Sequence, residues 1–494
     1  MNLRIRTVTA VLLGLYTLLF IQLNLVQLVR ADDYRSHPDN TRDIVRQFSE
    51  PRGAIVTADG VVVAETVEVE GELERLREYP HGELYAHLTG YVSLNYGASG
   101  LESAFHAQLA GTDREIDLKS LSDLFVDRVR TADVVLTIDH SVQRIARAAL
   151  GERNGAVVAI DTQTGAILAM YAWPTFDPNL LSSHDLDQAR EDRFALVSDP
   201  EKPTRSRAFQ ERYPPGSTFK IVTAAAGLEE EVVTPAEPEY EVADEYLAPQ
   251  TDHPITNFGD SSCGGNLTEM LRVSCNTGFA ELGVQIGADA LVAMAESFGF
   301  NSTPDIELAG VVESVVPSAD FYDENIPLLA QSAIGQFDVA ATPLQMALVA
   351  ATVANDGVML KPHLVAEVRD SEGTLVSSTD ADAAATPIEF ETARELSAML
   401  ENVAANGTAR SLQFDDDIAV AGKTGTAEVG ESDNTHAWIV GFAPADEPRV
   451  AVAVFLQGDV QTGPLTGGTH AGPVAREVMR AALEALIGDP TEQN

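Results

Sequence analysis

The chain is 494 residues long, which is too long for one ordinary domain and suggests about three. It carries 32 basic and 75 acidic residues, and the net charge of -43 argues against nucleic-acid binding and against a polybasic grip on anionic lipid. The acidic residues are spread along the whole chain, so we interpret them as a solvated surface. Adaptation to high salt is a hypothesis that would be refuted by folding and activity that do not depend on salt concentration.

Only two cysteines, Cys263 and Cys275, are present, so a disulfide framework and a metal cluster held by thiols are excluded. We expect no metal and no cofactor. The two cysteines are close in sequence, and a loop this short can close. They either form a disulfide or remain free thiols, and the sequence favours neither alternative.

An uncharged apolar segment begins the chain. The run of residues 8–29 would span about 33 Å as a helix, enough for the hydrocarbon core of a bilayer. Arg4 and Arg6 precede it, which favours a cytoplasmic N-terminus and an extracellular remainder. A signal peptide cleaved near residue 31 is the alternative, but the run is long for a signal-peptide core, so we expect a membrane anchor over residues 1–30. Gln22, Asn24 and Gln27 either contact a partner helix or lie at the membrane interface.

Residues 31–133 are predicted to form a separate N-terminal pedestal, or dimerisation-like, module. Residues 54–57 and 61–64 flank a glycine turn and predict a hairpin, and residues 103–109 predict a short helix. No set of residues suited to catalysis is recognisable in this module. We therefore expect it to provide spacing and partner contacts.

A larger domain is expected over residues 134–488, followed by a tail of residues 489–494. Residues 134–138 predict a strand, and residues 157–160 and 166–170 predict a hairpin apolar enough to be buried on both faces. Residues 437–442 and 450–456, together with the strand that carries Lys423, predict three consecutive neighbours. We expect all of these strands to form one central antiparallel sheet.

Helices are expected to flank this sheet, which gives an α/β (α+β) fold. Residues 141–150 have helical spacing, and residues 471–486 close the chain as another helix. Thr342 and Pro343 begin a helix that extends to residue 355 and is apolar enough to be buried nearly all round.

One candidate nucleophile lies in the stretch 213–220, whose sequence is Tyr-Pro-Pro-Gly-Ser-Thr-Phe-Lys. Two prolines and a glycine end the preceding structure, so Ser217 is expected at a helix N-terminus with Lys220 on the same face. A serine is a poor nucleophile until a base takes its proton, and a lysine whose pKa is lowered in a partly apolar site can act as that base. Alone, the pattern is weak, because a capping serine followed by a solvated lysine is common.

Two later motifs strengthen the hypothesis. Ser274-Cys275-Asn276 follows a predicted short helix, and Lys423-Thr424-Gly425-Thr426 lies in a strand-like run. The three motifs occur in this order with spacings of about 55 and 150 residues, which makes a chance match improbable. The trio is typical of penicillin-binding proteins and related lactamases.

From residue 133 to about residue 487, the chain therefore resembles the penicillin-binding, serine acyl-transferase domain. The whole layout resembles a class B penicillin-binding protein of the actinobacterial penicillin-binding protein A type. Further stretches carry this resemblance outside the three motifs: Arg52-Gly53, Gly100-Leu101-Glu102 and Ala333-Ile334-Gly335-Gln336.

The resemblance implies a D,D-transpeptidase that cross-links peptidoglycan stem peptides and is acylated by β-lactams. The expected ligands are stem peptides of the lipid-linked precursor and β-lactam antibiotics, and no nucleic acid. The residues before 133 cannot hold a glycosyltransferase domain, so glycan polymerisation is expected from a membrane partner. The resemblance suggests a polymerase of the shape, elongation, division and sporulation family.

The resemblance also implies roles for the motif residues. Ser217 attacks the carbonyl of the penultimate D-Ala, and Lys220 takes its proton. Ser274 relays a proton to the leaving amine, while Asn276 binds the peptide and steadies Lys220. The backbone N–H groups of Ser217 and Thr426 form the oxyanion hole.

The third motif is expected to bind substrate. The ammonium of Lys423 attracts the terminal carboxylate, and the hydroxyls of Thr424 and Thr426 add hydrogen bonds. Gly425 allows the substrate to approach the backbone closely. Trp438 and Phe442 are expected to pack within the sheet rather than contact a ligand. His436 and His470 either line the cleft or lie at the surface, and we expect the surface.

Two other classes of protein remain possible from the sequence. A carboxypeptidase or β-lactamase would share the motifs but hydrolyse the acyl-enzyme, although no Glu-x-x-Leu-Asn stretch supplies a β-lactamase's deacylating base. A β-lactam sensor or a polymerase scaffold would need no turnover, but a sensor is expected to have several membrane spans.

Overall fold

The computed structural model describes residues 2–26, 48–71, 73–112, 131–428, 434–459 and 462–487. The predictions on Gln27, on cleavage near residue 31 and on the tail of residues 489–494 lie outside these residues. The chain divides into two compact units, one of Met1–Pro51 with Val67–Leu76 and the other of Arg52–Thr66 with Arg77–Asn494.

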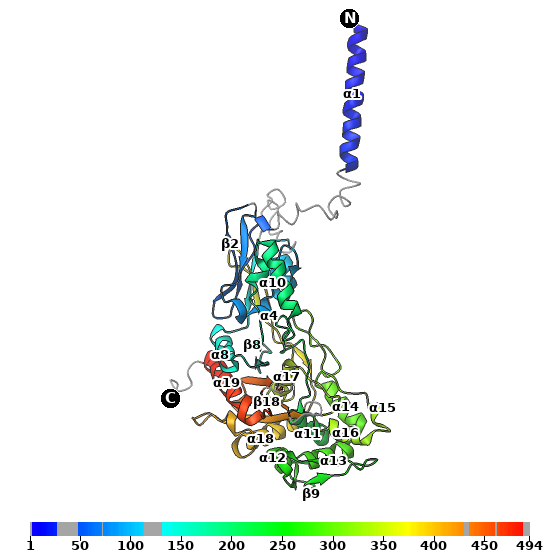
Figure 1. Ribbon diagram of the computed structural model, residues 1–494, viewed down its shortest axis with the longest axis vertical. Coiled ribbons are helices and arrows are strands. Elements are labelled where there is room, and N and C mark those ends of the chain that lie inside the picture. The colour runs from blue at the N-terminus through cyan, green and yellow to red at the C-terminus, as the bar shows by residue number, and fades with distance from the viewer. Residues whose placement is uncertain are drawn as a thin grey trace. The chain divides into compact units, whose positions relative to one another are not determined.

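The N-terminal helix α1 (Asn2–Asn24) lies in the first unit and is labelled in Figure 1. Its stretch Arg4–Asn24 has a mean hydropathy of 1.6 and is long and apolar enough to cross a membrane. Asn24 Nδ2 donates to the carbonyl of Phe20 at 2.8 Å, so this amide is satisfied within its own helix. The helix is consistent with a single-pass membrane protein.

The second unit is built on a five-stranded antiparallel sheet, in the order β17-β18-β19-β7-β8. Every residue of β18, β19 and β7 is buried, as expected for strands covered on both faces. The predicted hairpin and the three consecutive strands are confirmed, and the strand that carries Lys423 lies at the edge of the sheet. The strands are β17 (Ala421–Glu428), β18 (Thr435–Ala443), β19 (Val450–Leu456), β7 (Gly155–Asp161) and β8 (Ile167–Trp173).

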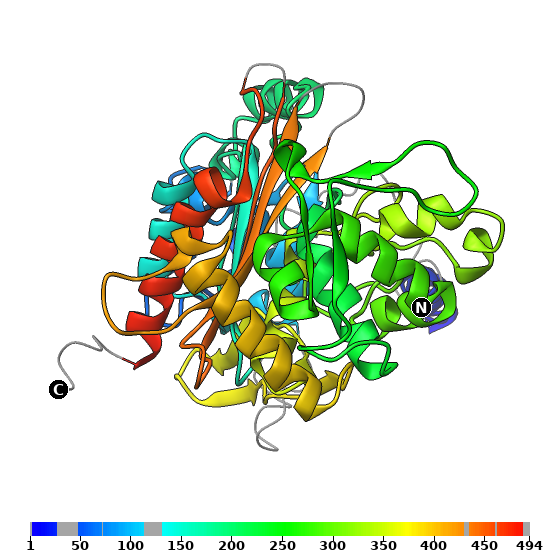
Figure 2. The same cartoon turned by 90° about the horizontal axis from the view of Figure 1, so that it is seen from below.

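Helices cover both faces of this sheet. Figure 2 shows α8 (His140–Leu150) and α19 (Gly472–Ile487) on one side and the green helical region with α11 (Lys220–Glu229) on the other. Helix α17 (Pro343–Ala354) packs on β19 and β7 and is buried on nearly every side, as predicted. Its first turn is capped because Thr342 Oγ1 accepts from the amide of Gln345 at 3.0 Å.

The expectation that residues 134–138 join the central sheet was wrong. Strand β6 (Ala132–Leu136) instead pairs in parallel with β1 (Ile55–Val56) and antiparallel with β14 (Val365–Asp370). Its side chains alternate between buried and half-buried, which suits a sheet with one solvated face rather than the doubly covered central sheet. This second sheet has six strands in the order β15-β14-β6-β1-β2-β3, and it contains the predicted hairpin as β1 and β2 (Val62–Glu68).

The remaining elements are short or lie in the helical region. In the N-terminal part they are β3 (Arg75–Glu78), η2 (Gly82–Leu84), α4 (Ala86–Thr89), β4 (Val92–Ser93), β5 (Gly97–Ala98), α5 (Gly100–Ala104) and α6 (His106–Leu109). Between the halves of the central sheet they are α9 (Asn179–Ser182), α10 (Leu186–Ser198), η4 (Gly216–Phe219), β9 (Tyr240–Ala243), β10 (Glu245–Tyr246), β11 (Ile255–Thr256), η5 (Phe258–Asp260), β12 (Cys263–Gly265), α12 (Leu267–Val273), α13 (Asn276–Ile286), α14 (Ala288–Ser297), α15 (Ala319–Tyr322), α16 (Ile326–Ser332), β13 (Met359–Leu360), β15 (Leu375–Ser378), β16 (Ala383–Ala385), α18 (Phe390–Asn406) and η6 (Arg410–Leu412), and a π-helical turn (Gly467–Ala471) precedes α19.

The two cysteines form a disulfide, which resolves the alternative that the sequence left open. Cys263 lies in β12 and Cys275 lies between α12 and α13, with 5.7 Å between their Cα atoms. Strand β12 pairs with β9, so the bridge ties this small hairpin to the start of α13. The second sequence motif is thereby fixed to a segment that precedes it.

Replacing both cysteines by serine is predicted to lower the free energy of unfolding. The bridge closes a loop with a sequence separation of 12, and the chain-entropy relation gives about 3 kcal/mol for a loop of this length. Denaturant unfolding of the wild type and of Cys263→Ser/Cys275→Ser measures the difference. A reducing agent should destabilise the wild type and leave the double variant unchanged, and equal stability of oxidised and reduced wild type would contradict the prediction.

Candidate active site

The turn that carries Ser217 is shaped by glycine. Ser217 lies in the 3₁₀ turn η4, which runs directly into α11 at Lys220, so it precedes the α-helix instead of opening it. Gly216 has φ of 52°, and a Cβ there would lie 2.6 Å from the carbonyl oxygen of Thr426. Only a glycine fits this position, because both the left-handed backbone and the close approach exclude a side chain. The turn therefore lies in close backbone contact with the third motif.

The stretch Ala333-Ile334-Gly335-Gln336 holds the same turn and the start of α11 through hydrogen bonds. The amide of Gly216 donates to the carbonyl of Gly335 at 2.9 Å. Thr223 Oγ1, one turn into α11, donates to the carbonyl of Ala333 at 2.7 Å. A Cβ on Gly335 would lie 2.1 Å from the carbonyl oxygen of Gly216, which explains the glycine. The resemblance singled out this stretch, and its contacts give the physical reason.

Lys220 is completely buried and is held by the second motif. Its Nζ donates to Asn276 Oδ1 at 2.7 Å and to the backbone carbonyl of Ser274 at 2.8 Å. Burial lowers the pKa of Lys220 well below its ordinary value, and the charge of Lys423 lowers it further. An amine with a lowered pKa, three residues after Ser217, is suited to accept a proton.

Ser274 joins the two lysines of the site. It ends α12 in the left-handed conformation, with φ of 63°, and its side chain accepts a hydrogen bond from Lys423 Nζ at 2.7 Å. Its carbonyl meanwhile accepts from Lys220. One residue therefore contacts both buried amines, and its hydroxyl can pass a proton between groups on either side.

Lys423 projects from the edge strand β17 and is fully buried. Burial lowers the pKa of Lys423 to about 7, so its charge is sensitive to an arriving anion. Thr424 Oγ1 donates to Thr408 Oγ1 at 2.7 Å. A Cβ on Gly425 would lie 2.8 Å from the carbonyl oxygen of Pro215, so the first and third motifs touch through their backbones. Thr426 is half-buried beside the same turn.

One supporting residue, Asn257, was missed by the sequence analysis. Its Oδ1 accepts from the amides of Asn276 and Thr277 at 2.9 and 3.1 Å, and its Nδ2 donates to the carbonyl of Ala243 at 3.0 Å. The side chain is buried and satisfies the first turn of α13 from a loop. Nothing in the local sequence distinguishes it, because its partners lie about 20 residues away and meet it only in the fold.

The aromatic and histidine residues near the site differ partly from expectation. Trp438 and Phe442 are fully buried in β18, as predicted. His436 is only 5% exposed and packs edge-on against Tyr213, so its expected surface position was wrong. The cause is its place on β18, where every side chain is buried. Burial lowers the pKa of His436 to about 4, and His470 is half-buried.

The geometry defines the chemistry that the site can perform. A serine in a tight turn, a buried amine with a lowered pKa, a bridging hydroxyl and a second lysine on an edge strand are the parts of a lysine-activated serine acyl transferase. No group of three or more His, Cys, Asp or Glu residues in the described part of the chain is arranged to hold a metal ion.

Comparisons with known families agree with this class. The penicillin binding protein transpeptidase domain matches residues 155–480, and the penicillin binding protein A dimerisation domain matches residues 52–135. The chain belongs to the penicillin-binding protein family with a transpeptidase domain.

Among its relatives is the peptidoglycan D,D-transpeptidase PbpA of Mycolicibacterium smegmatis, 38% identical over 98% of this chain and 99% of that protein. PbpA of Mycobacterium tuberculosis is 36% identical over 99% of this chain and 100% of its own. The ceftriaxone acyl-enzyme complex of penicillin-binding protein A from M. tuberculosis has a TM-score of 0.83 at 35% identity, covering 89% of this chain and 100% of that one. Its penicillin G acyl-enzyme complex has a TM-score of 0.81 at 36% identity, covering 88% of this chain and 100% of that one.

Asn257→Ala is predicted to slow acylation by β-lactams at least about tenfold, because two buried amides lose their acceptor and Asn276 loses its fixed position. Acylation rates with a fluorescent penicillin measure the effect. Ser261→Ala, an exposed change in the same segment, is the control. An Asn257→Ala protein that folds and acylates at the wild-type rate would show that this side chain does not position the second motif.

Proposed function

We propose that this protein is a peptidoglycan D,D-transpeptidase that cross-links stem peptides through an acyl-enzyme on Ser217 and is inhibited by β-lactams. The observation that carries the proposal is the contact of Ser274 with both Lys220 and Lys423, which unites the three motifs in one buried site. The curated relatives named above are peptidoglycan D,D-transpeptidases, and the solved acyl-enzymes of penicillin-binding protein A from M. tuberculosis support the same chemistry here.

In the acylation step, Ser217 Oγ bonds to the carbonyl carbon of the penultimate D-Ala while its proton moves to neutral Lys220. The backbone amides of Ser217 and Thr426 stabilise the developing oxyanion, since the close approach of Gly216 to Thr426 sets the two segments side by side. The bond to the terminal D-Ala then breaks, and the leaving amine receives a proton through Ser274.

In the second step, an amine of another stem peptide attacks the ester, and Ser217 regains its proton. In the acylation step, before the terminal D-Ala leaves, Lys423 as an ammonium holds the terminal carboxylate of the donor peptide, since an anion beside it favours its charged form. Thr424 and Thr426 add hydrogen bonds to that carboxylate, Gly425 admits the peptide backbone, and Asn276 contacts the peptide while holding Lys220.

The proposal also includes the membrane location, the domains and the partner of the enzyme. Helix α1 anchors the chain with its N-terminus in the cytoplasm and the catalytic domain outside, where a disulfide between Cys263 and Cys275 is chemically stable. The N-terminal module and the transpeptidase domain correspond to the predicted residues 31–133 and 134–488. A membrane glycan polymerase of the shape, elongation, division and sporulation family supplies the strands to be cross-linked.

Incubating the full-length protein in detergent with penicillin G is predicted to yield one covalent adduct that persists for hours, because a transpeptidase lacks a base that activates water. Intact-mass spectrometry detects the adduct. Ser217→Ala should give none, and Ser261→Ala should acylate normally. An adduct that vanishes within seconds would favour a hydrolase, and absence of any wild-type adduct would refute the catalytic assignment.

The second-order rate of acylation is predicted to be bell-shaped in pH. The neutral base Lys220 accumulates as pH rises through its lowered pKa, which gives the acid limb. The ammonium of Lys423 is lost as pH rises through about 7, which gives the alkaline limb. Rates with a fluorescent penicillin from about pH 5 to about pH 9 test this. Lys423→Arg should move the alkaline limb to higher pH, and a limb that stays near the wild-type position would contradict its assignment to Lys423.

A further inference from the structure

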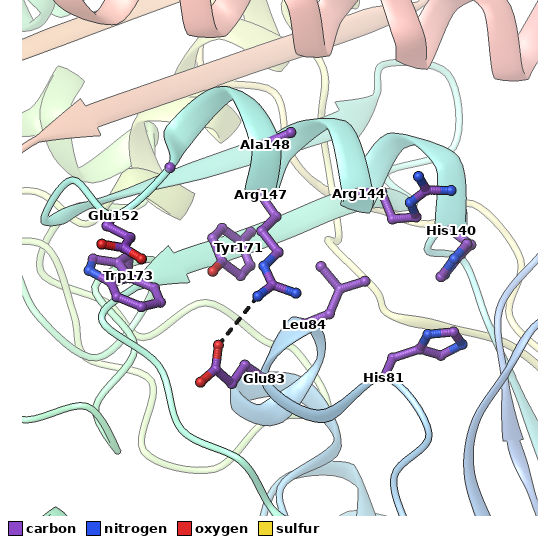
Figure 3. Close-up of a pocket in the computed structure, with 11 residues that line it drawn as sticks. His81, Glu83, Leu84, His140, Arg144, Arg147, Ala148, Glu152, Tyr171 and Trp173 are labelled. Atoms are coloured by element: carbon purple, nitrogen blue, oxygen red, sulfur yellow. Dashed lines mark hydrogen bonds and ion pairs between the residues drawn. The ribbon is translucent and has the colours of Figure 1, made fainter.

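A cavity of about 570 Å³ lies in the second unit, lined by side chains of η2, α8 and β8. Figure 3 shows these side chains facing one another across the space between the helix and the turn. None of the residues of the three sequence motifs lines it. A concave site of this size, with both aromatic and charged groups, has the character of a small-molecule site.

One end of the cavity is basic. His140 and Arg144 project from the same face of α8, and the ring of His81 lies 4.6 Å from the ring of His140. Among the described residues Arg144 forms no ion pair, whereas Arg147 lies 3.4 Å from Glu83. This end therefore offers a guanidinium that forms no ion pair within the described part of the chain, beside two imidazoles, and a guanidinium suits a carboxylate ligand.

The cavity also holds a buried hydroxyl that lacks a partner. Tyr171 is 3% exposed, and its hydroxyl makes no hydrogen bond of good geometry. Burial raises the pKa of Tyr171 to about 12, so the hydroxyl keeps its proton. Arg147 lies near the phenolic oxygen, but the hydroxyl proton has no acceptor among the described residues, which is unfavourable for a buried donor. Figure 3 shows the hydroxyl on the side of Trp173 and Glu83.

The other end of the cavity is suited to a sugar ring. Trp173 is half-buried and presents an aromatic surface, and Glu152 lies beside it as a hydrogen-bond acceptor (Figure 3). An apolar ring face can pack on Trp173 while hydroxyl groups donate to the carboxylate.

We infer that this cavity binds a carboxylate-bearing saccharide, with the acid group at Arg144, the ring on Trp173 and a ligand oxygen accepting from Tyr171. Within cell-wall glycan, muramic acid that lacks a peptide has this chemistry, because its lactyl group is then a free carboxylate. The choice of a cell-wall sugar rests on the proposed function, whereas the recognition of an acid and a ring rests on the cavity. The site would let the enzyme contact the glycan as well as the peptides.

Calorimetric titration of the full-length protein in detergent tests the inference with two matched probes. The disaccharide of N-acetylglucosamine and N-acetylmuramic acid carries the carboxylate, and di-N-acetylchitobiose is a similar disaccharide without it. The acidic disaccharide should bind saturably and at least about tenfold more tightly than chitobiose, as a charge-assisted hydrogen bond implies. Absence of saturable binding, or equal binding of both probes, would overturn the inference.

Two variants locate the binding. Arg144→Gln, an exposed change, should weaken the acidic disaccharide about tenfold or more and leave chitobiose unchanged. Arg190→Gln, on α10 and outside the cavity, is the matched control. Tyr171→Phe should weaken binding about threefold or more without lowering the melting temperature, because it removes a hydroxyl whose proton has no acceptor among the described residues of the free protein.

β-Lactam acylation of the same samples separates the two proposals. All three variants should acylate at the wild-type rate, since none of the changed residues belongs to the three motifs. If the wild-type protein acylates normally but does not bind the acidic disaccharide, only the inference about the cavity is overturned. If the wild-type protein does not acylate, the proposed function is overturned. Unchanged binding in both Arg144→Gln and Tyr171→Phe would place the ligand elsewhere.

Discussion

The site depends on two lysine side chains buried beside one serine. Burying an amine is costly unless its donors are satisfied, and two neighbouring ammonium groups cannot both remain charged in a dry site. Ser274 accepts a hydrogen bond from each amine, because its left-handed backbone directs the carbonyl to Lys220 and the hydroxyl to Lys423. In the proposed mechanism the two amines have different roles: Lys220, whose pKa is lowered further by the charge of Lys423, takes a proton, and Lys423 holds a carboxylate.

This arrangement requires several segments to be held in place from outside the motifs. Asn257 fixes the first turn of α13, the disulfide ties that turn to β12, and Gly335 accepts from the amide of Gly216. The rigid central sheet supplies Lys423 from its edge, where the outer side of β17 faces the nucleophile turn instead of another strand. The catalytic groups are thus mounted on regular elements, while loops supply the hydrogen bonds that orient them.

The sequence predicted most of the central sheet, the buried α17 and the three motifs, because apolar periodicity and short motifs are local signals. It failed for β6, since the choice between two sheets depends on which partner strands are available and not on the strand itself. It also failed for His436, whose polarity suggested the surface although all its neighbours on β18 are buried. Asn257 and the pairing of Cys263 with Cys275 could not be assigned because they depend on distances between segments that only the fold brings together.

The net charge of -43 affects how anionic ligands reach the cationic side chains of the protein. Charges on the surface are screened beyond about 10 Å in salt, so the acidic surface repels anions weakly at a distance and hardly alters a desolvated contact. Anionic substrates must therefore be captured where positive groups are concentrated in a concavity. Lys423 provides a cation in the proposed active site, and Arg144 provides one at the cavity beside α8. An acidic exterior with concave basic positions favours ligands that present one carboxylate at a defined point. An extended polyanion would also lie over the acidic surface and be repelled by it.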